Sequence, residues 1–274
     1  HNYENYGENM NIIKPALLKN GDTIGILAPS GAMGEDDTNL KRGIKFFENR
    51  GFNVKLAKNV YSKNNYLAGS DEERLDALHE MFLDKSVNAI IALRGGYGAI
   101  RLINKIDYDI IRKNPKIFCG YSDITALNAM FLKRAGLSTF SGPMIMSDFG
   151  QEKVCDYTID KFFQTVQQGK FDYDGKFWGG NLSTLVSLCG QDFIPDFKFT
   201  LFLEDLNEPP YKIDKMVTQL FNIEKLRKNV EAVAIGDFLD IEEDINYIFE
   251  ELKVPLIKNF PASHSAKKAT IPIG

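Results

Sequence analysis

The sequence lacks the features that disulfide-rich, metal-binding, nucleic-acid-binding and membrane-spanning proteins depend on. Its three cysteines (Cys119, Cys155 and Cys189) are odd in number and far apart, which is typical of neither a disulfide framework nor a metal site. Lysine and arginine are scattered and the net charge is −4, whereas a nucleic-acid surface needs a basic stripe. No apolar run approaches the ~20 residues that span a bilayer. We therefore expect a cytoplasmic protein without a metal, a cofactor, or a nucleic-acid or membrane partner.

The size of the chain allows one large core or two modest ones, since 44% of its 274 residues are hydrophobic. The first twenty residues lack the apolar core of a secretory signal. We expect Met10 to be the native start and the residues before it to be a tag remnant.

Between residues 22 and 145, short apolar runs alternate with helical patterns. The runs predict strands at 22–28, 53–57, 88–93 and 116–120, and the patterns between them predict helices at 36–51 and 70–84. Ser70 and Glu73 have the spacing of a capping box. Apolar strands joined by helices indicate a parallel sheet, in which ligands gather beyond the carboxyl ends of the strands. The turns "APSG", "RGGYG" and "GYSD" should therefore be the informative ones.

The second half of the chain predicts a smaller α/β domain. Its expected elements are helices at 181–189 and 211–222 and strands at 199–205, 231–238 and 254–257. We divide the chain into an N-terminal α/β domain at 10–150, a connection with one helix at 151–180, and a C-terminal domain at 181–274.

A serine stands at the junction of a strand and a helix in the run Gly120-Tyr121-Ser122-Asp123. Such a residue either caps the helix or is a nucleophile held at the carboxyl edge of the sheet. Ile124 replaces the last glycine of the Gly-x-Ser-x-Gly elbow, which disfavours the α/β-hydrolase family proper. Two other serines are better explained locally, Ser30 as a turn residue and Ser183 as a helix start.

A serine nucleophile needs a base, and the chain has only three histidines. His1 lies in the expected tag, and His79 lies at the edge of a helix's apolar stripe. His264 follows a strand in a segment rich in serine and alanine, so it is the candidate base by elimination.

The base needs an acid that orients it. Glu204 ends an apolar strand, where a carboxylate is unusual, and it is the candidate. Asp205 and Glu208 lie nearby, and we expect one of them to cap the following helix.

The turn "RGGYG" offers backbone amides to a developing oxyanion, and the amide of Asp123 is a second donor. A phosphate cradle is the alternative. However, Arg101 stands where the dinucleotide fingerprint has its third glycine, and the Gly-Lys-Ser/Thr ending of a P-loop is absent.

A set of motifs in matching order resembles the serine LD-carboxypeptidases, a family that includes the microcin immunity peptidases. The motifs, within residues 19–274, are "GDTIGILAPSG", "YLAGSDEERLDAL", "ALRGGYGAIRLI", "GYSDITAL", "SGPM", "GGNLSTL", "LFLEDLNEPPYKIDKM" and "H…TIPIG". The resemblance implies a Rossmann-like N-terminal domain that bears Ser122 and a C-terminal domain that bears Glu204 and His264. It also implies that the amides of Gly96 and Asp123 form the oxyanion hole, and that the protein is a homodimer.

The implied reaction is hydrolysis of the bond between an L-diamino acid and a terminal D-alanine in a peptidoglycan-derived peptide. "GGNLSTL" and "LEDLNEPPYKIDKM" favour the murein tetrapeptide branch. The alternative is a microcin-immunity-like hydrolase of aminoacyl or peptidyl nucleotides, and a non-catalytic ligand-binding protein is the alternative of another class.

Three more residues are candidates for substrate binding. Arg94 is a candidate for holding the terminal carboxylate or, alternatively, is a surface ion-pair partner. Tyr97 and Tyr211 are either groove walls or aromatic packing between the domains. The family has glycine after the histidine, often with asparagine a little later, and usually extends beyond the point where this chain ends. Here the run is His264-Ser-Ala-Lys-Lys268, so we expect different contacts at the substrate rim.

Overall fold

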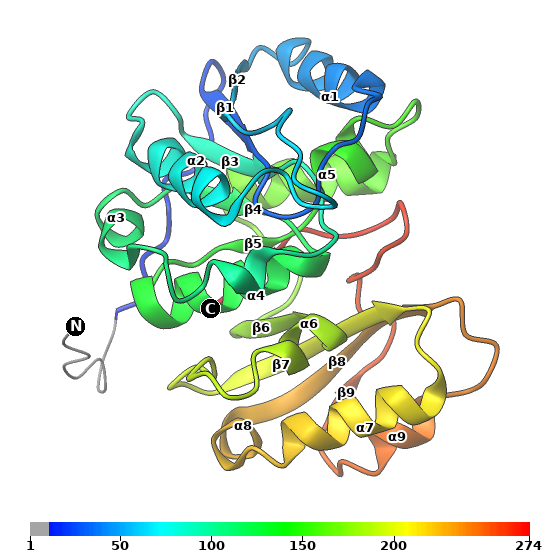
Figure 1. Cartoon of the computed structure of the whole chain (residues 1–274). Coiled ribbons are helices and arrows are strands. Elements are labelled where there is room, and N and C mark those ends of the chain that lie inside the picture. The colour runs from blue at the N-terminus through cyan, green and yellow to red at the C-terminus, as the bar shows by residue number, and fades with distance from the viewer. Residues whose placement is uncertain (1–10) are drawn as a thin grey trace.

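The computed structural model describes residues 11–274 and contains two β-sheets, one above the other in Figure 1. The expectations about Met10 and His1 lie outside the described residues. Within residues 11–274, no helix is long and apolar enough to cross a membrane.

The first sheet has the strand order β10-β5-β4-β3-β1-β2. Its strands are β1 (Thr23–Leu27), β2 (Asn53–Leu56), β3 (Ala89–Ala92), β4 (Ile117–Cys119), β5 (Phe140–Ser141) and β10 (Ile271–Pro272). The first five run parallel, while β10 pairs antiparallel with β5. β3 is buried along its whole length, as expected for a central strand of a parallel sheet.

Helices pack around this sheet, and the first four of them connect its strands. They are α1 (Thr38–Glu48), α2 (Asp71–Leu83), α3 (Tyr108–Lys113), α4 (Thr125–Met130) and α5 (Asp156–Gln168). The capping box at the start of α2 is confirmed: the Ser70 hydroxyl accepts the amide of Glu73, and the Glu73 carboxylate accepts the amide of Ser70. The four strands and two helices predicted for this part are all present.

The second sheet has the order β6-β7-β8-β9, and all of its strands are parallel. Its strands are β6 (Phe177–Asn181), β7 (Phe199–Leu206), β8 (Val230–Leu239) and β9 (Leu256–Ile257). Its helices are α6 (Leu182–Ser187), α7 (Pro210–Phe221), α8 (Glu224–Asn229) and α9 (Asn246–Glu250). The sequence did not predict β6, which begins within the stretch 151–180 that was expected to be a connection. The domain boundaries stay a prediction.

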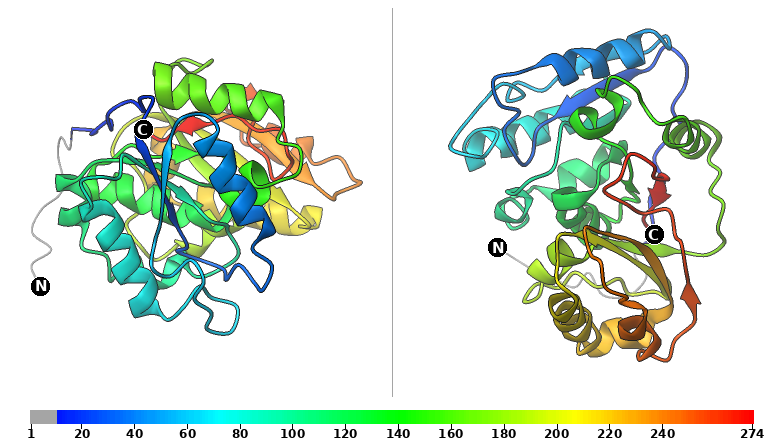
Figure 2. Two further views of the ribbon diagram at one scale, coloured as in Figure 1. Left: turned by 90° about the horizontal axis from the view of Figure 1, so that it is seen from above. Right: turned by 90° about the vertical axis from the view of Figure 1, so that its right-hand side faces the viewer.

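The predicted fold class, a Rossmann-like N-terminal part with a parallel sheet and a smaller α/β C-terminal part, is confirmed. α4 packs against β6 and α6, between the two sheets (Figure 1). The end of the chain, red in Figure 2, passes from the second sheet back to the first, where it forms β10. Residues from the first sheet and from the last segment of the chain therefore meet where the two sheets face each other.

Candidate active site

Ser122 lies three residues beyond the end of β4, in a strained turn. Its φ of 60° is in the left-handed region, which is uncommon for a residue other than glycine. Ser122 is the first residue of a short 3-10 helix (Ser122–Ile124) that leads into α4, and neither helix has a side-chain cap. The capping interpretation of this serine is therefore wrong, and the strained conformation is of the kind that concentrates at functional sites.

The glycine turn after β3 lies against the serine. A Cβ atom on Gly95 would stand 3.0 Å from Cβ and 3.1 Å from Oγ of Ser122, and 3.6 Å from the amide nitrogen of Asp123. Gly96, with a φ of 109°, follows in a conformation that favours glycine. The turn can therefore bring its backbone amides close to a group bound at the serine.

Hydrogen bonds join the three turns that the sequence singled out. The Asp123 carboxylate accepts from the Ser30 hydroxyl (2.6 Å) and from the amide of Ala99 (2.9 Å), while the amide of Gly31 donates to the carbonyl of Gly95 (3.1 Å). Burial raises the pKa of Asp123. Ser30 is indeed a turn residue, but its hydroxyl is buried and anchors Asp123.

Glu204 and His264 are hydrogen bonded, although 60 residues separate them. Nδ1 of His264 lies 2.6 Å from Oε2 of Glu204, and the two side chains are 14% and 4% exposed. Burial raises the pKa of Glu204, and the hydrogen bond from His264 acts in the opposite direction. Because Nδ1 is engaged by the carboxylate, Nε2 is the ring nitrogen left to exchange a proton with another group.

The ring of Tyr121 connects this pair to the serine turn. It meets the imidazole of His264 edge to face, with 5.0 Å between the ring centroids. Tyr121 immediately precedes Ser122, so the serine turn and the His264 loop are neighbours in space. The structure thus joins His264 to Glu204 and places Tyr121, the neighbour of Ser122 in the chain, against the imidazole; the catalytic role of the three residues stays a prediction.

Two of the three candidates for substrate binding lie on the glycine turn. The Arg94 guanidinium donates to the carbonyl of Ala32 (3.0 Å), which uses one of its N–H groups. The Tyr97 ring is 42% exposed and lies 5.9 Å from the ring of Tyr66, which is also exposed.

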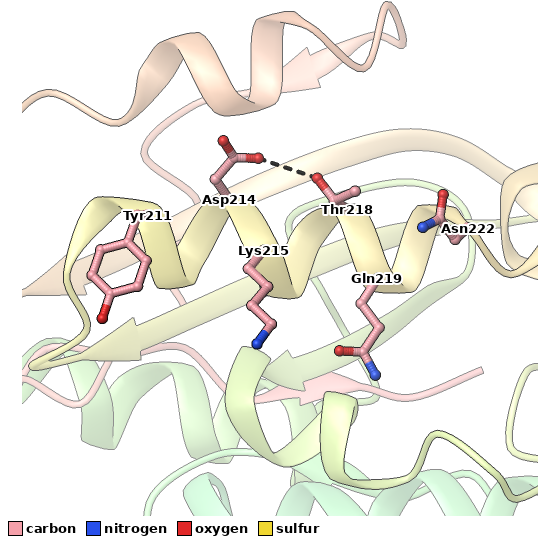
Figure 3. Close-up of a pocket in the computed structure, with 6 residues that line it drawn as sticks. All are labelled: Tyr211, Asp214, Lys215, Thr218, Gln219 and Asn222. Carbon is pink, nitrogen blue, oxygen red and sulfur yellow. Dashed lines mark hydrogen bonds between the residues drawn. The ribbon is translucent and has the colours of Figure 1, made fainter.

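Tyr211 lies elsewhere, in a pocket of about 410 Å³ along α7 (Figure 3). The other residues of this pocket are polar, and Asp214 accepts a hydrogen bond from Thr218 (3.1 Å). Across residues 11–274, no hydrogen bond or ring contact is recorded between Tyr211 and Ser122, Glu204 or His264. Its role as a groove wall stays a prediction.

One expectation about charged residues is wrong. Neither Asp205 nor Glu208 caps α7, which begins with proline and has no side-chain cap. Asp205 instead accepts from the amide of Ser183 at the start of α6 (2.9 Å). Lys268, in the run after His264, is buried in an ion pair with Asp148, and the expected difference in contacts at the substrate rim stays a prediction.

Cys119 and His79 both lie in structural surroundings. Cys119 is fully buried, and burial raises the pKa of its thiol. His79 is structural: its Nε2 accepts the amide of Asp107 (3.0 Å), and burial lowers the pKa of the imidazole.

Two features beside the site are not predicted by the sequence patterns. One is Asn181, whose side chain contacts Glu204 and Asp205. The motif "GGNLSTL" is a signal for it, although the local pattern predicts only a helix start at this asparagine. The other is the pair Lys268–Asp148, whose members are 120 residues apart and carry no local pattern.

Known families and structures agree with this fold. A family model for the LD-carboxypeptidase N-terminal domain matches residues 24–142, and one for the LD-carboxypeptidase C-terminal domain matches residues 174–274. The probable murein peptide carboxypeptidase of Bacillus subtilis (strain 168) is 36% identical, over 95% of this chain and 89% of the relative.

Two solved structures are similar over nearly the whole chain. The muramoyltetrapeptide carboxypeptidase from Oxalobacter formigenes has 31% identity and a TM-score of 0.82, covering 92% of each chain. An MccF-like protein from Bacillus anthracis str. Ames has 30% identity and a TM-score of 0.86, covering 95% of this chain and 94% of that one. These similarities make the protein a serine peptidase, as the motifs predicted. The chain belongs to the LD-carboxypeptidase family.

Proposed function

We propose that this protein hydrolyses the bond between the L-diamino acid and the terminal D-alanine of murein tetrapeptides, with Ser122, His264 and Glu204 as its catalytic group. The observation that carries this proposal is the 2.6 Å hydrogen bond between His264 and the buried Glu204, placed next to the strained serine turn by the ring of Tyr121.

In the proposed mechanism, Oγ of Ser122 attacks the carbonyl carbon of the scissile bond and passes its proton to Nε2 of His264. Glu204 accepts a hydrogen bond from the Nδ1–H group of His264, which fixes the tautomer of the ring and stabilises the imidazolium. His264 then protonates the nitrogen of the departing D-alanine as the C–N bond breaks. Water, deprotonated by His264, attacks the acyl-enzyme and releases the shortened peptide.

The amides of Gly96 and Asp123 are the proposed oxyanion hole. The turn that contains Gly96 contacts Ser122 through Gly95, and the amide of Asp123 directly follows the nucleophile. Both are therefore close to the carbonyl under attack, where the loss of one donor typically costs about 10²- to 10³-fold in kcat.

The remaining roles concern substrate binding and assembly. Arg94 is the proposed partner of the terminal carboxylate of the substrate. Recognition of this carboxylate is what distinguishes a carboxypeptidase from an endopeptidase. Tyr97 and Tyr211 are the proposed groove walls. A homodimer and a cytoplasmic location are proposed on the family resemblance, and analytical ultracentrifugation and cell fractionation test them.

A second candidate substrate is an aminoacyl or peptidyl nucleotide, as for microcin immunity peptidases. The similarity to the MccF-like structure and the exposed aromatic pair Tyr66–Tyr97 favour it, because a nucleobase stacks on such rings.

The test is turnover of both substrate types by the purified protein. We expect release of D-alanine from a murein tetrapeptide, with lysine or diaminopimelate at the third position, and a loss of about 10³- to 10⁶-fold in Ser122→Ala. Cleavage of an aminoacyl-sulfamoyl adenosine alone would favour the second candidate. Full activity in Ser122→Ala would overturn the mechanism, and no turnover of any substrate would favour a binding protein.

A further inference from the structure

The motif Gly179-Gly180-Asn181 at the end of β6 has no part in the mechanism above. Asn181 is buried and is the register partner of Glu204 on the neighbouring strand β7. Its side-chain nitrogen donates to Oε1 of Glu204 (3.4 Å) and to Oδ1 of Asp205 (3.0 Å). The oxygen of Glu204 that does not face His264 therefore has its own donor.

The orientation of the Asn181 amide is determined by its other partners. Its oxygen accepts three hydrogen bonds at the start of α6, from the amide and the hydroxyl of Thr184 (3.0 and 2.8 Å) and from the hydroxyl of Ser183 (2.9 Å). A flipped amide would turn its oxygen toward two carboxylates and its N–H groups toward these donors. The nitrogen must therefore face Glu204.

The backbone of Asn181 contacts the other side of the site. Its amide donates to Oγ1 of Thr125 (3.1 Å), in the helix that follows Ser122. The two glycines make this approach possible: a Cβ atom on Gly180 would lie 2.6 Å from Oγ1 of Thr125, and one on Gly179 would lie 2.0 Å from the carbonyl oxygen of Phe202. Their φ values of 141° and 149° also favour glycine.

We infer that Asn181 is a positioning residue that holds the Glu204 carboxylate with Oε2 toward His264 and ties it to the Ser122 helix through Thr125. This inference rests on the proposed function of the Ser122, His264 and Glu204 group. A carboxylate with a partner on one oxygen only is free to rotate, whereas a donor on each oxygen fixes its plane. The same donor also offsets the repulsion between the adjacent carboxylates of Glu204 and Asp205, and it lowers the pKa of Glu204 against the effect of burial.

The test compares Asn181→Asp with Thr184→Val. Ionised aspartate keeps an acceptor for the start of α6 but has no donor for Glu204, whereas Thr184→Val removes one contact to the same Asn181 oxygen and leaves the donor in place. A small fluorophosphonate is the probe: Ser122 Oγ forms a bond to phosphorus, fluoride leaves, and His264 takes the serine proton. This reagent does not use the peptide-binding contacts.

We expect Asn181→Asp to lower the labelling rate and kcat by the same factor, about 10- to 100-fold, with KM nearly unchanged. Thr184→Val should label at the wild-type rate, with at most a lower Tm. Thr125→Val removes the acceptor of the Asn181 backbone amide and should show a smaller loss of labelling rate. This variant is the test if Asn181→Asp does not fold.

Wild-type labelling of folded Asn181→Asp, or an equal loss in Thr184→Val, would overturn the inference. If Asn181→Asp is unfolded, wild-type labelling of Thr125→Val overturns it. If the wild type labels at Ser122 but releases no D-alanine, the proposed substrate fails while the labelling comparison still decides the role of Asn181.

Discussion

The ring of Tyr121 lies edge to face against the imidazole of His264, and the ammonium group of Lys268 lies 4.6 Å from the centroid of the same ring. One buried aromatic side chain next to Ser122 is thus in contact with the candidate base and with a buried ion pair. Burial raises the pKa of the Tyr121 phenol, so it stays neutral. The loop that contains His264 is held against the first sheet by these contacts.

The buried pair Lys268–Asp148 makes a first prediction about stability. Their side chains are 3% and 1% exposed, and Asp148 also accepts from the amide of Met144 and the hydroxyl of Ser147 (both 2.9 Å). Lys268→Met leaves a buried carboxylate without its cation and should cost about 3–5 kcal/mol in urea unfolding.

The matched double variant separates this effect from packing. Lys268→Met with Asp148→Asn leaves no unpaired charge and keeps an acceptor for the two remaining donors, so it should recover at least half of the loss. A double variant less stable than Lys268→Met alone would show that the ion pair is not the source of the cost.

Glu204 makes a prediction about pH. Because burial raises its pKa above the usual value of 4.5, the folded state holds this proton more tightly than the unfolded state does. The stabilisation that protonated Glu204 contributes to the folded state is therefore complete below pH 4.5, and it is lost as the pH rises through the pKa of Glu204 in the folded state. The glutamine of Glu204→Gln cannot ionise, so the difference in Tm between this variant and the wild type should shift in favour of the variant as the pH rises from 4 to 8. We expect its kcat to fall by about 10³- to 10⁴-fold.

The control for this measurement is Glu251→Gln, at an exposed glutamate on the surface. Its Tm difference from wild type should not depend on pH. A pH-independent difference for Glu204→Gln as well would contradict the assigned direction of the pKa shift.

Gly95→Ala tests the contact between the glycine turn and the nucleophile. The added methyl group would stand 3.0 to 3.1 Å from the Ser122 side chain, so the serine or the turn must move. We expect kcat to fall by about 10²-fold, with a small change in Tm. Gly175→Ala, whose Cβ would meet no atom within 4 Å, should affect stability alone. Equal kcat values for the two variants would show that the glycine turn is not part of the active site.

Tyr97→Ala tests the proposed groove wall. Its ring is exposed on the turn that contacts Ser122, and we expect KM to rise by about tenfold while kcat changes little. Tyr211→Ala tests the second proposed wall by the same measurement. Tyr247→Ala, at an exposed tyrosine on α9, is the control. A KM for Tyr97→Ala equal to that of the control would contradict the proposed wall.

Sequence patterns were sufficient where physical constraints are local. The continuous apolar run of β3 and the capping box of α2 identify their elements without help from distant residues. Glu204 was distinguished because a carboxylate at the end of an apolar strand needs a partner, and the structure provides His264.

Patterns failed where long-range contacts decide the structure. β6 contains Gly179 and Gly180, which disfavour a strand locally but are required by the close approach of Phe202 and Thr125. β10 has only two residues, and its pairing with β5 depends on the return of the chain end to the first sheet. The partner of Lys268 is likewise far away in the sequence.

Mass spectrometry of the fluorophosphonate adduct, with the modified residue located by peptide mapping, tests the assignment of the nucleophile most directly. We predict a single adduct on Ser122, formed at a rate that falls by about 10³-fold or more in His264→Ala and in Glu204→Gln. An adduct on another serine, or a rate on Ser122 that neither substitution changes, would contradict the account.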